Sequence, residues 1–231
     1  MNRRLWPLAT LLFGIATLAA FLGLGAQPAV RAAYEPDLVS TAVSVFQRAE
    51  SLSDLVRVFG APPNPAIIHA QNAINTLDLS AFIPAYALFL VAAAIMIGGW
   101  RNRWAQAAIV FGLLGAAADV METWKQLQIG AIFAADSLAA EEFLPLAPWH
   151  WLKYLALALN GLAVATLFVT AGRKHWLLAA IAAAPLPLVG AAYLDALSTR
   201  TFASAFALYW IALLLLAAWR TIRPPPQPAA S

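Results

Sequence analysis

Six long apolar segments limit the folds open to this chain more than any other feature. They cover residues 5–25, 79–100, 104–124, 150–171, 176–196 and 202–219. Since about 20 helical residues cross the roughly 30 Å hydrocarbon core of a membrane, each segment is long enough to span it. Backbone groups in lipid must satisfy their own hydrogen bonds, which favours helices. The sequence therefore predicts an all-α, polytopic membrane helical bundle with six transmembrane helices.

Composition supports a membrane protein and excludes several other classes. Of 231 residues, 62% are hydrophobic and only 11% are charged, whereas about one quarter of a soluble domain is charged. The absence of cysteine excludes disulfides, thiolate metal sites and iron–sulfur clusters. The formal net charge of +3 comes from short basic clusters between apolar segments. These clusters indicate topology signals, so we expect membrane lipids and no nucleic acid as partners.

The basic residues predict the orientation of the chain. The short links "RNRW" and "RKHW" join antiparallel neighbouring helices. Basic residues in these links and near both ends fall on one side, without any acidic residue: Arg3, Arg4, Arg101, Arg103, Arg173, Lys174, Arg220 and Arg223. By the positive-inside rule this side is the cytoplasm, which places both termini there. The Ala-rich, Arg-preferring composition is typical of a bacterial inner membrane.

The chain divides into four predicted parts. Residues 1–25 form an N-terminal membrane anchor, because the apolar run is longer than that of a usual signal peptide. Cleavage as a signal peptide is the alternative and would leave five spans. Residues 26–78 form an outer, periplasmic segment, and residues 79–219 form a five-helix bundle. The Pro-rich end, residues 220–231, is a cytoplasmic tail.

The outer segment carries the signals of two amphipathic surface helices. Ser51 and Asp54 have capping-box spacing, and Gly60 marks a helix end. One apolar face is expected to hold Leu52, Leu55, Val56 and Phe59, and a preceding one within residues 37–50 to hold Val39, Val43, Phe46 and Ala49. Asn64 then caps the next helix, with Pro65 in its first turn.

Two carboxylates interrupt the third apolar segment. Asp119 and Glu122 share one helical stripe with Gly112 and Gly115, and small residues in membrane helices mark the face that packs on neighbours. At 1.5 Å per residue, Asp119 lies about 7 Å below Trp124 and the outer aromatic belt. Carboxylates facing lipid at that depth would cost a few kcal/mol each. The sequence therefore predicts that both face the bundle interior in the outer leaflet half.

Further polar residues enter the membrane from the same predicted side. The candidate ligand-binding residues are Asp78, Tyr86, His150, Lys153, Asn160 and Asp195. Asp119 and Glu122 form a candidate catalytic acid–base pair, with Lys153 and His150 as tuning groups. Only three histidines are present and no HExxH motif occurs, so we expect no metal site. No cofactor signature is found either.

The stretches "LDLSAFIPAYALFL", "GAAADVMETW" and "WLKYLALA" together resemble a pattern of uncharacterised bacterial multi-span inner-membrane proteins. That pattern reads Asp-x-x-x-Phe-Ile-x-x-Tyr, then Asp-x-x-Glu-Asn, then a later Lys. In this chain it falls on Asp78, Phe82, Ile83, Tyr86, Asp119, Glu122 and Lys153. Thr123 stands where the pattern has Asn. The resemblance implies that the carboxylates and the lysine belong together, and it carries no activity.

Several functions remain open from the sequence. The charged residues either fix helix register as a structural ion-pair network or bind a lipid or small amphipathic ligand from the periplasmic side. One alternative is a membrane-embedded acid–base enzyme acting on a lipid or isoprenoid. Another is an accessory subunit of a membrane complex, with a membrane-protein partner or a second copy of the chain. Coupled transport fits poorly, because the inner halves of the spans are almost purely apolar.

Overall fold

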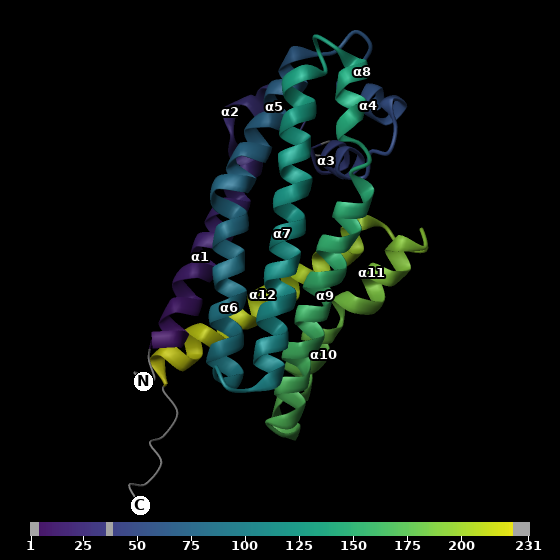
Figure 1. Ribbon diagram of the computed structural model, residues 1–231. Coiled ribbons are helices and arrows are strands. Elements are labelled where there is room, and N and C mark those ends of the chain that lie inside the picture. The colour runs from purple at the N-terminus through teal and green to yellow at the C-terminus, as the bar shows by residue number, and fades with distance from the viewer. Residues whose placement is uncertain (1–4, 36–38, 224–231) are drawn as a thin grey trace, which may run out of the picture. The chain divides into compact units, whose positions relative to one another are not determined.

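The computed structural model describes residues 5–35 and 39–223. Within these ranges every regular element is helical, as the coiled ribbons of Figure 1 show. The predicted all-α fold class is confirmed. Most of the predicted Pro-rich tail, together with Arg3 and Arg4, lies outside the described residues.

Six helical segments among the described residues are long and apolar enough to cross a membrane. The first three are Leu5–Ala33 (α1 Leu5–Ala26 and α2 Pro28–Ala33), Pro65–Gly98 (α5 Pro65–Leu77, the π-helical turn η1 Asp78–Phe82 and α6 Ile83–Gly98) and Arg103–Ile132, which is α7. The fourth is Ser137–Thr170 (α8 Ser137–Ala140, η2 Glu141–Phe143 and α9 Ala147–Thr170). The last two are Arg173–Tyr193 (η3 Arg173–His175, α10 Trp176–Ala183 and α11 Pro185–Tyr193) and Arg200–Ile222, which lies within α12 Thr199–Ile222. The outer segment adds α3 Val39–Gln47 and α4 Leu52–Phe59. The prediction of six spans is confirmed.

Large apolar side chains cover much of the surface of these segments. Leu22, Leu177 and Leu215 are more than half exposed, and so are Trp100 and Trp219. Exposed apolar surface of this extent is unfavourable in water and marks contact with a partner or a membrane. The helices therefore fit a multi-pass membrane protein.

Two helices extend beyond the predicted spans. The second span is part of a continuous helical segment that starts at Pro65, where the Asn64 side chain accepts a hydrogen bond from the N–H of Ala66 as predicted. The third helix, α7, continues past Trp124 to Ile132. Its last turn packs through Ile129, which is fully buried against the outer helices. This apolar contact extends the helix beyond the polar residues Lys125, Gln126 and Gln128 that follow the predicted span.

Prolines account for two local changes of helix geometry. The N–H of Ile83 donates to the carbonyl of Asp78, five residues earlier, in the π-helical turn η1. Pro84 follows and has no N–H to donate to Ser80, so a regular α-helical ladder cannot continue there. The fifth span is divided in a similar way, because α10 ends at Ala183 and α11 begins at Pro185.

The chain forms two compact units. The first unit comprises residues 1–16, 86–113 and 156–231, and the second comprises residues 17–85 and 114–155. The second unit therefore contains the whole outer segment. It also contains the three carboxylates Asp78, Asp119 and Glu122.

Within the first unit, α12 packs against α10 and α11. A buried polar contact ties three helices together. The side-chain amide of Asn160 donates to the carbonyl of Ala108 at 2.8 Å, and the Tyr209 hydroxyl donates to Asn160 Oδ1 at 2.9 Å. The backbones pack closely at the next residue, where a Cβ on Gly161 would overlap the carbonyl oxygen of Ala182.

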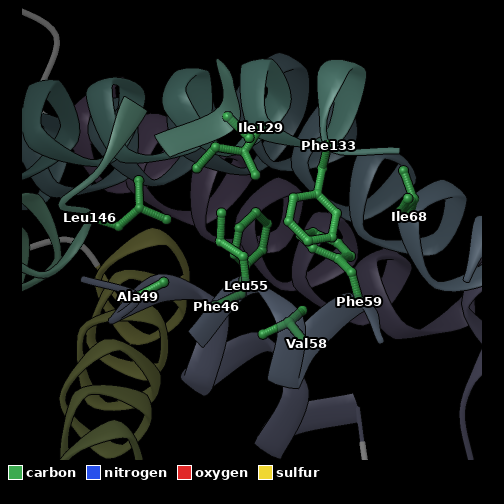
Figure 2. Packing of buried hydrophobic residues seen from close by; sticks show 10 residues of the cluster. Phe46, Ala49, Leu55, Val58, Phe59, Ile68, Ile129, Phe133 and Leu146 are labelled. Atoms are coloured by element: carbon green, nitrogen blue, oxygen red, sulfur yellow. The ribbon is translucent and has the colours of Figure 1, made fainter. Parts of the chain in front are cut away.

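The second unit has an apolar core between the outer helices and the end of α7. Figure 2 shows Phe46, Phe59 and Phe133 at its centre, with ring centroids 5.1 Å apart for Phe46–Phe59 and 5.0 Å apart for Phe59–Phe133. The buried residues of this core are Phe46, Ala49, Leu55, Val58, Phe59, Ile68, Ile129, Phe133, Ala140 and Leu146. The outer segment is therefore folded onto α7 and not an extended linker.

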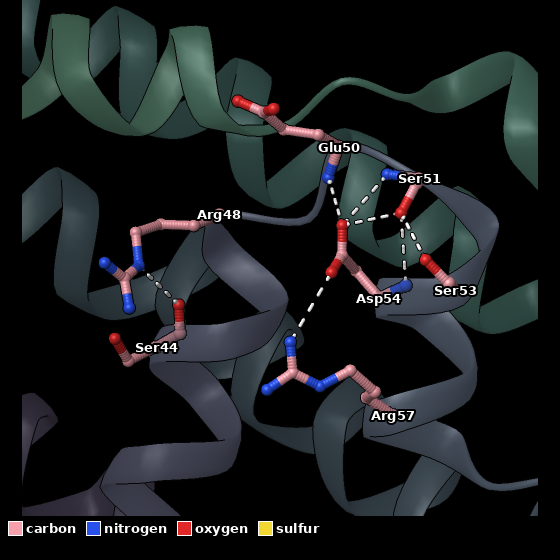
Figure 3. A network of polar contacts seen from close by, with 7 residues as sticks. All are labelled: Ser44, Arg48, Glu50, Ser51, Ser53, Asp54 and Arg57. Carbon is pink, nitrogen blue, oxygen red and sulfur yellow. Dashed lines mark hydrogen bonds and ion pairs between the residues drawn. The ribbon is translucent and has the colours of Figure 1, made fainter.

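The predicted capping of α4 is confirmed in detail (Figure 3). The N–H of Asp54 donates to Ser51 Oγ at 3.3 Å, and the N–H of Ser51 donates to Asp54 Oδ2 at 3.1 Å. The N–H of Glu50 donates to the same Asp54 oxygen at 3.1 Å, and this bond is the largest of the causes that lower the pKa of Asp54. Gly60, with φ of 88°, ends the helix as predicted.

The predicted apolar face of α4 is wrong at one position. Val56 is 37% exposed, whereas Val58 is buried beside Leu55 and Phe59. The core formed with Phe46 lies on the side of the helix that carries positions 55, 58 and 59. Residues at i, i+3 and i+4 share a face for either choice, so periodicity alone did not separate Val56 from Val58.

Candidate functional site

Two carboxylates of α7 bind one ammonium group of α9. Asp119 and Glu122 are 4% and 1% exposed, and Lys153 is 4% exposed. Lys153 Nζ lies 2.9 Å from Asp119 Oδ1 and 2.7 Å from Glu122 Oε2. Residues three apart on a helix are neighbours on its surface, which lets both carboxylates reach the same partner. The burial agrees with the prediction that these side chains face protein.

A third carboxyl group comes from the π-helical turn η1. The Thr123 hydroxyl of α7 donates to Asp78 Oδ2 at 2.9 Å. Asp78 also interacts electrostatically with Asp119 and Lys153. It is only half-buried, unlike the two carboxylates of α7. The structure therefore brings Asp78 to the same site from a segment that is distant in sequence.

His150 completes the group, but its ring nitrogens have no hydrogen-bond partner among the described residues. Its ring is fully buried, and its Nδ1 lies 3.7 Å from Glu122 Oε1, beyond hydrogen-bond distance. Gln126 Nε2 donates to that same Glu122 oxygen at 3.2 Å. The His150 ring packs edge-on against Tyr154, with 4.8 Å between centroids.

We refer to Asp78, Asp119, Glu122, His150 and Lys153 as the charged cluster. It contains three carboxyl groups and one ammonium group. Arg48, near the end of α3, adds an electrostatic interaction with His150, so carboxyl groups remain in excess even when Arg48 is counted. Burial of unbalanced charge is unfavourable. The arrangement is therefore suited to receive a proton or a positively charged group.

The remaining candidate residues belong to the first unit. Tyr86 is fully buried, with its ring 5.3 Å from that of Trp210. The Asn160 side chain is hydrogen-bonded to Ala108 and Tyr209, as described above. Asp195 is exposed beyond the end of α11, with φ of 55°. The structure thus brings Asp78, His150 and Lys153 together with the candidate acid–base pair. Tyr86, Asn160 and Asp195 belong to the first unit.

A separate polar groove lies along α5. Its volume is about 380 Å³ and its lining residues are Gln27, His69, Asn72, Ala73, Thr76, Leu77 and Ser80. The hydroxyls of Thr76 and Ser80 donate to carbonyls one turn earlier. Positions 69, 72, 76 and 80 share one helical face, and Asp78 lies on another. The groove is therefore distinct from the charged cluster.

Sequence reasoning did not select Thr123, Gln126 or Tyr154, which contact the cluster. Gln126 could have been found, because it is one turn beyond Glu122 on the same helix face. No group of three or more His, Asp or Glu residues suited to a metal ion occurs among the described residues. Comparison of the chain with models of protein families, with curated proteins and with solved structures found no match.

Proposed function

We propose that this multi-pass membrane protein binds the polar end of a lipid or another small amphipathic molecule at the charged cluster, from the periplasmic side of a bacterial inner membrane. One observation carries the proposal: the buried ring of His150 has no hydrogen-bond partner among the described residues, in a site that has an excess of carboxyl groups. A buried polar group without a partner costs about 1–3 kcal/mol. A bound polar group would supply the missing hydrogen bonds.

A purely structural role explains only part of the cluster. Lys153 pairs with Asp119 and Glu122 in an arrangement that joins α7 to α9. That pairing would serve to fix helix register with no ligand at all. It leaves Asp78 and His150 unexplained, because neither forms an ion pair with Lys153 and the ring nitrogens of His150 have no hydrogen-bond partner among the described residues. The binding proposal therefore depends on Asp78 and His150.

Native mass spectrometry of the detergent-purified protein, followed by lipid extraction, tests this proposal. Wild type is expected to retain a specific amphipathic molecule, and His150→Phe to lose it, because Phe keeps the ring volume without the nitrogens. Asp195→Asn is the control, since Asp195 is an exposed acid of the other unit. Retention of the same bulk phospholipids by all three proteins would contradict the proposal. A partner chain or second copy in the spectra would favour the accessory-subunit alternative.

A second candidate function is an acid–base enzyme acting on a lipid or isoprenoid. The separation of 3.7 Å between His150 Nδ1 and Glu122 Oε1 favours it, because catalytic hydrogen bonds are often long in the absence of substrate. Glu122→Gln preserves the shape of the side chain and removes its proton-transfer capacity. The enzyme hypothesis expects this variant to retain the ligand but to form no product from lipid extracts, as followed by chromatography and mass. If wild type also forms no product, the enzyme hypothesis is rejected.

A further inference from the structure

We infer that the polar end bound at the charged cluster is an alkylammonium group, and that Asp78 is the carboxylate that receives it. This inference rests on the proposed function and adds the chemical class of the ligand. It is carried by three features of the second unit: how the existing positive charge is used, where Asp78 lies on its helix, and the state of His150.

The cationic side chains near Asp78 are already bound to other groups. Lys153 Nζ is within 2.9 Å of both carboxylates of α7. Arg48 Nε donates to the carbonyl of Ser44 at 3.3 Å, and Lys125 Nζ donates to the carbonyl of Phe143 at 2.9 Å. Asp78 receives only the neutral Thr123 hydroxyl among the hydrogen bonds of the described residues. An ammonium group would give this carboxylate a charge-assisted hydrogen bond.

The sign of the charge selects the ligand. A phosphate or carboxylate placed beside Asp78 would face three carboxyl groups and one ammonium group, which is already paired. A neutral polar group would leave the excess of carboxyl groups in place. An ammonium group reduces it and offers three N–H donors. Electrostatic complementarity therefore favours a cation.

Asp78 is the carboxylate of the cluster that is most accessible to a ligand. Asp78 is the first residue of the π-helical turn η1 and the only half-buried carboxylate of the cluster. Turns of π-helix within α-helices are rare and occur frequently at functional sites. A cation that reaches Asp78 does so without separating Lys153 from its two partners.

His150 gives independent support for an incomplete site. Its Nδ1 points toward Glu122 at 3.7 Å, and both ring nitrogens lack hydrogen-bond partners among the described residues. A buried polar side chain in this state is uncommon, because buried polar atoms are nearly always satisfied. The site is thus polar, short of partners and negative on balance, which suits an ammonium ligand with an apolar chain.

Lipid competition tests the inference. Purified protein is equilibrated with an equimolar mixture of phosphatidylethanolamine, the same lipid with its amine acetylated, and phosphatidylglycerol, and bound lipid is counted by native mass spectrometry. Wild type and Asp195→Asn are expected to prefer the amine-bearing lipid by about tenfold, the effect of one hydrogen bond to a charged group. Asp78→Asn is expected to lose this preference. Circular dichroism and the unfolding midpoint establish that the variant is folded.

The outcomes separate this inference from the proposed function. Equal retention of the three lipids by wild type without binding of octylamine, and with loss in His150→Phe, would overturn the ammonium inference alone. Preference for the amine that survives in Asp78→Asn would overturn the role of Asp78. Absence of specific lipid in wild type, together with no binding of octylamine, would overturn both proposals. Binding of octylamine without any preference among the lipids would support an ammonium ligand that is a soluble amine and not a headgroup.

Discussion

At the scale of single residues, one lysine determines whether the charged cluster is compatible with burial. Lys153 is the cation that contacts both Asp119 and Glu122. Removing one partner of a buried ion pair leaves an uncompensated charge, which costs far more than the pair contributes relative to an apolar pair. The stability of this region therefore depends on each buried charge keeping its partner. Removal of both partners together is expected to cost less than removal of one.

Lys153→Gln is expected to lower the free energy of unfolding by about 3–5 kcal/mol, because two carboxylates stay buried without their cation. Combining it with Asp119→Asn should restore part of this loss. Thermal unfolding in detergent measures both. Lys174→Gln, at an exposed lysine of η3, is the matched control and should behave as wild type. A single Lys153→Gln variant as stable as the control would show that the pair does not hold the cluster.

The lowered pKa of Asp54 predicts that the stability of the outer segment depends on pH. Its pKa is lowered first by the hydrogen bond from the Glu50 N–H and further by those from Ser51 and by Arg57. Because the folded pKa lies below the unfolded value, its stabilising contribution is present above the unfolded pKa, about 3.9, and is lost as pH falls through the folded pKa. Acidification should therefore destabilise α4 by about 1 kcal/mol, the usual size of a capping interaction.

Proteolysis of the outer segment by pepsin at several acidic pH values measures this change. Asp54→Asn is the control, since it cannot be protonated and should lack the Asp54-dependent part of the acid response. The same acid sensitivity in both proteins would assign the response to another group.

At the scale of elements, small residues decide how closely helices approach. Gly161 of α9 faces the carbonyl of Ala182 near the end of α10, and a Cβ at this position would overlap that carbonyl oxygen. Carbonyl oxygens of the backbone cannot move aside as a side chain can. Small residues that let backbones pack closely are a general device of membrane helices. The contact of α9 with α10 therefore requires glycine at this position.

Gly161→Ala is expected to destabilise the protein by about 1–3 kcal/mol, because the added methyl forces α9 and α10 apart. Gly190→Ala is the matched control, since no atom lies within 4 Å of a Cβ at that position of α11. The control should be neutral or slightly more stable, as alanine favours helix by up to about 1 kcal/mol. Comparison of unfolding midpoints decides between them, and equal effects would argue against close backbone packing.

At the scale of the whole molecule, the orientation in the membrane stays a prediction. The chain has no cysteine, so a single introduced cysteine can be labelled without background. Lys174 in η3 and Glu142 in η2 are both exposed. A membrane-impermeant maleimide should label Glu142→Cys in intact cells but Lys174→Cys only after permeabilisation. This result would place the basic links in the cytoplasm, as the positive-inside rule requires. The reverse labelling would invert the orientation and the proposed side of ligand entry.

Properties that depend on local sequence were predictable without the tertiary structure. Helical backbone in six apolar segments follows from hydropathy and from the need to satisfy hydrogen bonds in lipid, and the caps of α4 and α5 follow from side chains that bond to their own neighbours. Burial of Asp119 and Glu122 could also be argued, since the small residues of their stripe identify the packed face.

Only the tertiary structure decided which distant groups meet. Val58 replaces Val56 in the core because the position of Phe46 and Phe133 sets the buried side of α4. The contact of Thr123 with Asp78 joins segments 45 residues apart, a separation over which sequence periodicity carries no information. The unpartnered state of His150 is likewise a property of its surroundings. Local backbone chemistry thus determined the helices, whereas packing between them determined the site.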